Sequence, residues 1–202
     1  RFTGTSAAAP MVSGVIALML EVNPALGWRD VQHIIMRTST MLEGDSASWA
    51  TNAAGYSFND DFGSGSVNAE DAVAMARKYE ESPDLMLGKQ QKAEYAQKTL
   101  NRIVPLGNNP VEVKFNVTEK LQAEHVTLNV DISHGNRGEL QIDLVSPSGM
   151  ESRLANPHTE IATTSANSSL PGIRDFTFST LRNWGENSEG TWTVVVRGGN
   201  TE

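Results

Sequence analysis

Hydrophobic residues over roughly the first 80 positions recur at helical spacing and predict three helices. The first, Ser6–Val22, has apolar side chains on every side, which is typical of a helix in the core of a larger domain. Asn23-Pro24 ends it, because proline disfavours a helical conformation in the residue before it. The second helix is predicted over Trp28–Arg37. The third follows the turn Gly63-Ser64-Gly65, with Asn68 as its N-cap. These helices carry more apolar surface than they can bury together, so we expect them to need a sheet that this chain lacks.

From residue 111 onward the hydrophobic period changes to two, the period of a half-buried strand. A polar stretch over residues 80–98 separates the two patterns and is interpreted as a linker. The alternating apolar positions are Val111, Val113, Phe115 and Val117; Val126, Leu128, Val130 and Ile132; Leu140, Ile142 and Leu144; Phe176 and Phe178; and Trp192, Val194 and Val196. Because turn residues separate these short runs, the pattern predicts an antiparallel sandwich or barrel.

Composition and charge exclude several classes of function. The 202 residues carry a net charge of −8, and the 16 Lys and Arg are scattered, so we expect no nucleic acid partner. The absence of cysteine excludes disulfides, thiolate metal sites and cysteine nucleophiles. The longest apolar run, Val15–Leu20, is too short to span a bilayer, so we expect no membrane span. The chain begins at Arg1 without Met and enters a motif almost at once, which indicates an upstream portion.

The segment Gly4-Thr5-Ser6-Ala7-Ala8-Ala9-Pro10 carries the candidate chemistry. It places the hydroxyl of Ser6 at the N-terminus of a buried helix, where free N–H groups and the helix dipole favour an anion. A serine that attacks a peptide carbonyl generates an oxyanion beside its own N–H, so this position suits a nucleophile. Gly4 allows a tight turn, and Pro10 is expected near the helix start, where a missing N–H costs least. For an isolated serine, the alternative is a simple helix cap.

The complete heptapeptide resembles the catalytic-serine signature of the subtilases. The runs GVIALMLEVNPALGWRDVQHIIMRTS and WATNAAGYSFNDDFGSGSVNAEDAVAMA are similar to the end of the catalytic domain in the kexin/furin branch. The runs NRGELQIDLVSPSGMESRLANPH and GIRDFTFSTLRNWGENSEGTWTVVV resemble the P domain (homo B domain) of that branch. The chain is thus identified as a member of the kexin-like subtilases, also called proprotein convertases.

The resemblance implies a multi-domain chain. Residues 1–84 would hold the C-terminal helices of an α/β subtilisin-like catalytic domain, and residues 85–202 an all-β, jelly-roll-like P domain. The strand Trp192–Arg197 runs into the turn Gly198-Gly199-Asn200, and P domains continue past such a turn with another strand. We therefore expect the β-domain to be truncated at its end, with unpaired backbone groups beside Thr191–Arg197.

The resemblance also implies a serine endopeptidase that acts through a Ser6 acyl-enzyme, with cleavage after basic residues. Thr3, Gly4 and Thr5 match positions that flank the substrate cleft. In subtilases the triad order is Asp, His, Ser, so the His, the Asp and the oxyanion Asn belong upstream of Arg1. The four histidines all follow Ser6 and are interpreted as structural or surface-exposed. This chain alone is accordingly expected to be inactive.

The expected partners are protein or peptide substrates and the upstream remainder of the catalytic domain, in a secreted, periplasmic or cell-surface protein. Family resemblance implies structural Ca²⁺ bound by ligands mainly outside this chain. Asn59-Asp60-Asp61 lacks the ligand spacing of an EF-hand loop, so we assign no metal ligand here. The alternative function is a non-catalytic β-sandwich binding or stabilising module with a vestigial protease remnant. The intact heptapeptide favours the peptidase.

Overall fold

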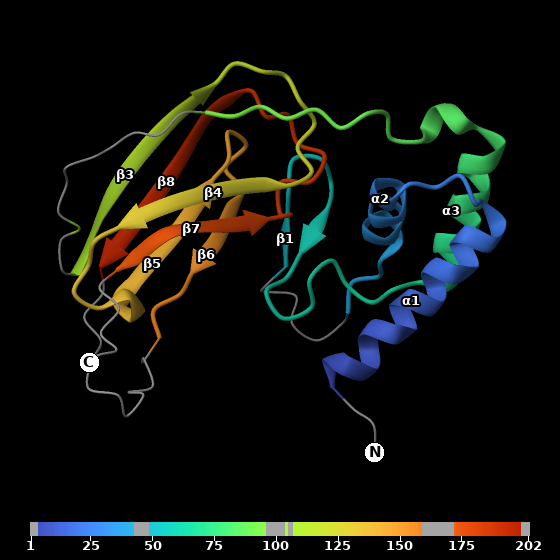
Figure 1. Cartoon of the computed structure of the whole chain (residues 1–202), viewed down its shortest axis with the longest axis horizontal. Coiled ribbons are helices and arrows are strands. Elements are labelled where there is room, and N and C mark those ends of the chain that lie inside the picture. Colours follow the sequence, from blue (N-terminus) through green and yellow to red (C-terminus); the bar gives the residue numbers. More distant parts are fainter. Residues whose placement is uncertain (1–3, 43–48, 96–103, 105–106, 159–171, 199–202) are drawn as a thin grey trace. The chain divides into compact units, whose positions relative to one another are not determined.

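The computed structural model describes residues 4–42, 49–95, 104, 107–158 and 172–198 (Figure 1). The chain divides into two compact units. The first, called the helical unit, comprises Arg1–Ala50 and Tyr56–Lys92, and the second, called the β unit, comprises Thr51–Gly55 and Ala93–Glu202. The chain therefore passes between units three times. The domain boundary placed at residues 84 and 85 from sequence stays a prediction.

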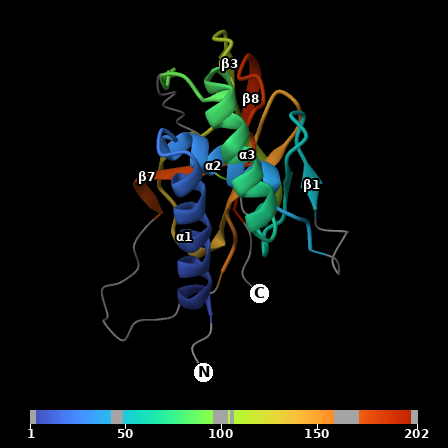
Figure 2. The ribbon, with the colours of Figure 1, turned by 90° about the vertical axis from the view of Figure 1, so that its right-hand side faces the viewer.

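The helical unit contains three helices at the predicted positions. They are α1 (Thr5–Val22), α2 (Trp28–Thr38) and α3 (Ala69–Glu81), and a short 3₁₀ turn, η2 (Pro83–Leu85), follows α3. The predicted N-cap of α3 is confirmed, because the side chain of Asn68 accepts a hydrogen bond from the N–H of Asp71 at 3.1 Å. Figure 2 shows α1 and α3 side by side.

The core of the helical unit lies where the three helices meet. Its buried residues are Val15, Met19, Leu26, Ile34, Ala72, Ala76 and Tyr79. The alanines of α3 let the helices approach closely. Only one side of α1 takes part, since Met11 is 67% exposed and Leu18 is 48% exposed. The helix predicted to be surrounded by a core is therefore buried on one side only within this unit.

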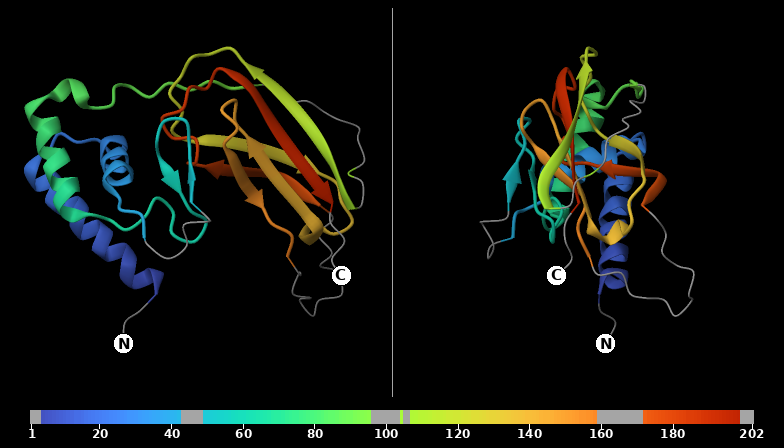
Figure 3. Two further views of the ribbon diagram at one scale, coloured as in Figure 1. Left: turned by 180° about the vertical axis from the view of Figure 1, so that it is seen from behind. Right: turned by 90° about the vertical axis from the view of Figure 1, so that its left-hand side faces the viewer.

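The β unit contains two antiparallel sheets (Figure 3). The strands of the first sheet, in spatial order, are β3 (Gly107–Val117), β8 (Gly190–Gly198), β5 (Leu140–Val145) and β6 (Glu151–Ala155). The second sheet pairs β4 (Val126–Ile132) with β7 (Ile173–Thr180). Five of these strands were predicted from the period of two. The strand β6, with the sequence ESRLA, was missed because its apolar residues do not alternate over its length.

Apolar residues from both sheets form one core in the β unit. The buried members are Leu140, Ile142, Leu144, Trp192, Val194 and Val196, all from the four-stranded sheet. Val126, Leu128 and Val130 on β4, with Phe178 on β7, pack against them. The predicted antiparallel sandwich is confirmed in this coarse form. The jelly-roll topology stays a prediction.

The expectation of a vacant edge beside Thr191–Arg197 is wrong. β8 pairs with β3 on one side, in a register that runs from Val117 opposite Gly190 to Gly107 opposite Gly198. On the other side β8 pairs with β5 from Thr193 onward. The strand is therefore central in its sheet, and Val194, Val195 and Val196 are all buried there.

A short hairpin connects the helical unit with the β unit. Its strands are β1 (Ala50–Thr51) and β2 (Ser57–Phe58), and its tip, Thr51–Gly55, belongs to the β unit. The amide of Asn52 is buried there and donates to the carbonyl oxygens of Arg182 and Trp184, both at 2.9 Å. The hairpin tip is thus held by residues about 130 positions later in the sequence.

A buried carboxylate lies on the outer face of the four-stranded sheet. Asp143 on β5 is 1% exposed and alternates with the core residues Ile142 and Leu144. Its oxygens accept from the guanidinium groups of Arg153 and Arg197. Two charge-assisted hydrogen bonds from neighbouring strands therefore compensate the burial of this charge.

We expect Asp143→Ala to destabilise the β unit by about 2–3 kcal/mol, because it leaves two guanidinium groups without their shared carboxylate. Asp131→Ala is the matched control, since Asp131 pairs with Arg174 at 2.8 Å and both side chains are more than half exposed. The control should cost less than about 1 kcal/mol. Urea unfolding followed by tryptophan fluorescence measures both, because Trp184 and Trp192 are buried in this unit. Equal losses of stability in the two variants would contradict the assignment.

Candidate active site

Gly4 forms the N-cap of α1 in a conformation that favours glycine. Its φ is 89° and its ψ is −173°. A Cβ built on Gly4 would meet no atom within 4 Å, so space does not impose the glycine. The positive φ does, because residues with a side chain rarely adopt it. The backbone turn that leads into the helix therefore depends on Gly4.

Ser6 is the second residue of α1 and is exposed. The alternative in which Ser6 caps the helix is wrong, because Gly4 is the N-cap and no side chain makes a capping hydrogen bond. Its hydroxyl makes no hydrogen bond to any described residue. The carbonyl of Gly4 accepts from the N–H groups of Ala7 at 2.9 Å and Ala8 at 3.2 Å. Among the described residues the serine hydroxyl thus has no hydrogen-bond partner, at the positive end of an 18-residue helix.

Pro10 lies further into the helix than the sequence suggested. The helix begins at Thr5, and the N–H groups of Ala7 and Ala8 already donate to the carbonyl of Gly4. Pro10 lies beyond this first turn, and its missing N–H leaves the carbonyl of Ser6 without its helical hydrogen bond. The proline was expected near the helix start, where a missing N–H costs least, and in the structure it removes one helical hydrogen bond. The carbonyl oxygen that loses this hydrogen bond belongs to Ser6, the candidate nucleophile.

The predicted site residues Gly4, Thr5 and Ser6 lie together at the start of α1 and are all exposed. Thr3 lies outside the described residues. The four histidines have contacts in their own parts of the chain. His33 meets the ring of Tyr56, His125 meets that of Trp184, His134 contacts the backbone of Asn136, and His158 contacts that of Asn156. Within the described chain, no histidine makes a hydrogen bond with Ser6.

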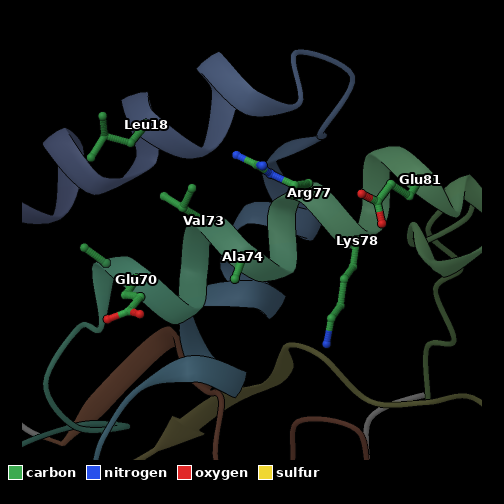
Figure 4. Close-up of a pocket in the computed structure, with 8 residues that line it drawn as sticks. Leu18, Glu70, Val73, Ala74, Arg77, Lys78 and Glu81 are labelled. Carbon is green, nitrogen blue, oxygen red and sulfur yellow. The ribbon is translucent and has the colours of Figure 1, made fainter.

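A shallow groove of about 680 Å³ runs between α1 and α3 (Figure 4). Leu18 and Val73 lie on its facing sides. Charged residues of both signs, including Glu70 and Arg77, line it as well. The groove does not include Ser6, so it is not the candidate active site.

The described residues do not fit a metal site. They contain no group of three or more His, Cys, Asp or Glu side chains arranged to hold an ion. In the acidic turn at residues 59–61, the side-chain oxygen of Asn59 already accepts from the N–H groups of Asp61 at 2.8 Å and Phe62 at 3.1 Å. This oxygen is used to form the turn, so it is a poor ligand for a cation.

The helix α1 is long and apolar enough to cross a membrane by length and composition, with a mean hydropathy of 1.5. A core helix of a soluble domain satisfies the same test. The run of six apolar residues considered in the sequence therefore understated the apolar character of this helix, because alanines and glycine continue it toward Thr5. The expected absence of a membrane span stays a prediction.

A buried carboxylate that the sequence analysis missed lies in the β unit. Glu186 is 3% exposed. Its carboxylate accepts from the N–H of Ala53 at 2.9 Å, from the hydroxyl of Ser148 at 2.7 Å and from the amide of Asn183 at 3.0 Å. Glu186 thus joins the tip of the hairpin, the turn after β5 and the turn before β8 in one polar cluster. No motif or period marks it, since its partners are far apart in sequence.

The hydrogen bonds at Glu186 change its pKa. Burial alone would raise the pKa of this carboxyl, because it disfavours the charged form. The donors from Asn183, Ser148 and the backbone of Ala53 favour the charged form and together hold the pKa below its ordinary value. Glu186 is therefore a stabilising charge at neutral pH.

Comparison with known proteins assigns two family segments. Residues 1–65 match the Subtilase family, and residues 123–202 match the proprotein convertase P-domain. Human proprotein convertase subtilisin/kexin type 7 is 41% identical over 96% of the chain, and PC3-like endoprotease variant B from Hydra vulgaris is 34% identical over 97%. The crystal structure of a serine protease from Aeromonas sobria superimposes with a TM-score of 0.80 at 26% identity, over 98% of the chain.

The chain is much shorter than these proteins. It spans 24% of the human relative, 27% of the Hydra relative and 37% of the Aeromonas protein. The family segments also divide the chain differently from the compact units. Asn52 and Ala53 fall in the subtilase match, whereas Glu186 falls in the P-domain match, yet all three belong to the β unit.

We expect Glu186→Gln to destabilise the β unit by about 1–3 kcal/mol at pH 7. The N–H₂ group of the new carboxamide would face at least one donor that now donates to a carboxylate oxygen, so that hydrogen bond would be lost. Since the folded pKa is depressed, the stabilisation is present above the unfolded pKa and is lost as the pH falls through the folded value. The difference in free energy of unfolding between the parent chain and the variant should therefore become smaller below about pH 4. Urea titrations at several pH values measure it.

Glu189→Gln is the matched control, because Glu189 lies three residues away and its exposed side chain pairs at the surface with Lys120 at 3.4 Å. It should leave stability almost unchanged. Hydrogen exchange should also speed up over residues 51–55 in the Glu186 variant alone. Unchanged exchange there would show that the cluster does not hold the hairpin tip.

Proposed function

Because the chain belongs to the kexin-like subtilases, we propose that it forms the end of the catalytic domain and the P domain of a secreted serine endopeptidase. One observation carries the proposal. The hydroxyl of Ser6 is exposed and has no partner among the described residues, at the N-terminus of a helix whose sequence matches the Subtilase family. The hydroxyl of a helix-capping serine accepts a hydrogen bond from a backbone N–H, whereas the hydroxyl of a nucleophile must be accessible to the substrate.

The proposed reaction is acyl transfer. The Ser6 oxygen attacks the carbonyl carbon of the scissile peptide and forms a C–O bond, while an upstream His takes the hydroxyl proton. The same His then gives that proton to the leaving amine as the C–N bond breaks. Water hydrolyses the resulting ester and restores the hydroxyl. An upstream Asp orients the His throughout.

The start of α1 supports the charged intermediate. The oxyanion forms next to the N–H of Ser6, which has no acceptor among the described residues. The first turn of α1 contains no acidic residue that would repel a negative charge. Gly4 sets the angle at which the chain enters the helix. Thr3, Gly4 and Thr5 are proposed to border the substrate, as family resemblance implies.

The upstream remainder of the catalytic domain is the proposed partner of α1. Apolar side chains such as Met11, Leu18 and Leu20 are exposed on this helix. Fully burying an exposed side chain of this size contributes about 1.5–3 kcal/mol, and the part of each that is still exposed here would contribute a proportionate share of that. The general base, the orienting Asp, the oxyanion Asn and the pocket that prefers basic residues belong to that remainder. The P domain, placed at residues 85–202, stabilises the catalytic domain.

Structural Ca²⁺ in the complete protein is proposed to bind outside this chain. The described residues contain no group of three or more His, Asp or Glu side chains arranged to hold an ion. A secreted or cell-surface location is proposed because the similar proteins include convertases and a bacterial serine protease. The alternative, a non-catalytic β-sandwich module, is less favoured because residues 1–65 match the Subtilase family with the serine in place.

We expect the 202-residue chain to hydrolyse no peptide, because its serine lacks the base that activates it. The test incubates the purified chain with fluorogenic peptides that end in a basic residue, beside the complete protein as positive control. Turnover by the chain that a serine protease inhibitor abolishes would contradict this expectation.

In the complete protein, Ser6→Ala should lower kcat/KM for peptide cleavage by about 10³-fold or more, because the nucleophile is lost. The variant should fold normally, since only a hydroxyl without a described partner is removed. Ser13→Ala is the matched control on the same helix, where the hydroxyl donates to the carbonyl of Ala9 at 3.2 Å. It should retain nearly full activity. Near-parental cleavage by the Ser6 variant would show that another residue is the nucleophile.

A further inference from the structure

The β unit carries a sequence pattern that the peptidase function does not use. Asn116-Val117-Thr118 is an N-x-Thr sequon, the acceptor pattern for N-linked glycans. A second sequon, Asn167-Ser168-Ser169, lies outside the described residues. Many sequons are buried in folded proteins or carry no glycan, so the pattern alone does not identify a glycosylation site. The exposure and the hydrogen bonds of Asn116 in the fold are therefore needed as well.

Asn116 lies near the end of β3 and is exposed. Val113 and Phe115 pack against the core, whereas Lys114 and Asn116 alternate with them on the outer face. A large oligosaccharide at Asn116 would therefore extend into solvent from the outer face of the sheet. Its attachment would displace no side chain of the core.

The hydrogen bonds around Asn116 are compatible with attachment. The side-chain oxygen accepts from the hydroxyl of Thr191 at 3.0 Å. The side-chain nitrogen, to which the sugar would be joined, makes no hydrogen bond to a described residue. An N-linked sugar replaces one hydrogen on that nitrogen and leaves the oxygen unchanged. The contact with Thr191 would thus persist.

β3 is an edge strand. It pairs with β8 on one side, and among the described residues no strand pairs with its other side (Figure 3). An edge strand presents unpaired N–H and C=O groups that invite pairing with another chain. The charged side chains of Glu112 and Lys114 already oppose such pairing. A bulky, hydrated group at the end of the same strand would oppose it further.

We propose that Asn116 is an N-glycosylation site whose glycan shields the edge strand β3. The co-reactant is a lipid-diphosphate-linked oligosaccharide. The Asn116 Nδ2 forms a bond to C1 of the first N-acetylglucosamine, the C1–O bond to the diphosphate breaks, the lipid diphosphate leaves, and Nδ2 loses one proton. The inference rests on the proposed secretory location, but not on peptidase activity.

The test secretes the chain from cultured animal cells behind a cleavable signal peptide and maps glycopeptides by mass spectrometry. Most secreted molecules should carry a glycan on Asn116. Thr118→Ala should abolish that glycan, whereas Thr118→Ser keeps the sequon and should retain it. Asn129→Gln is the matched control, because Asn129 is an exposed strand asparagine without a sequon. A secreted parent chain that is unmodified at Asn116 would overturn the proposal, whatever the peptidase assays give.

Shielding is tested by comparing the secreted Thr118→Ala and Thr118→Ser proteins, which differ at Asn116 only in the glycan. The unglycosylated protein should show a higher fraction of dimers and larger species in sedimentation velocity at equal concentration. Equal self-association would overturn the shielding role. If Thr118→Ala is not secreted, Asn116→Gln gives the same comparison without altering Thr118.

Discussion

An apolar helix whose second residue is an exposed serine has to bury more than one of its sides. α1 satisfies this requirement only in part, since Val15 and Met19 are buried against α2 and α3 while Met11 and Leu18 are largely exposed. The hydrophobic effect therefore makes the helix depend on further chain. The same burial would hold the helix N-terminus, and with it the Ser6 hydroxyl, at a fixed place in the proposed catalytic domain. The rest of the helical unit, chiefly α2 and α3, buries one side of α1.

The start of α1 combines two local departures from regular structure. Gly4 enters the helix at positive φ, and Pro10 removes the hydrogen bond to the carbonyl of Ser6. Both departures affect the peptide units next to the hydroxyl, where a regular helix would be more stable. The start of α1 is thus less stable than a regular helix at the residues that the proposed reaction uses, as is common at functional sites.

The β unit depends on polar contacts as well as on its core. Asp143 ties three strands of one sheet together through Arg153 and Arg197. Glu186 and Asn52 hold the hairpin tip, so a segment of the subtilase match is a structural part of this unit. The boundary between family segments is consequently not the boundary between compact units. The β unit contains residues from both sides of the predicted linker.

Local pattern alone predicted the helices and most of the strands, and resemblance to the subtilase signature predicted the candidate nucleophile. The period of α1, the cap at Asn68 and the alternation in β3 depend on neighbouring residues, which the sequence displays directly. The tertiary structure decided the rest. It placed β8 between two strands, put Pro10 in the second turn of the helix, and brought Glu186 to Ala53 across 133 positions. Pairing partners and buried hydrogen bonds between distant residues leave no periodic signal, because they are selected by how the whole core packs.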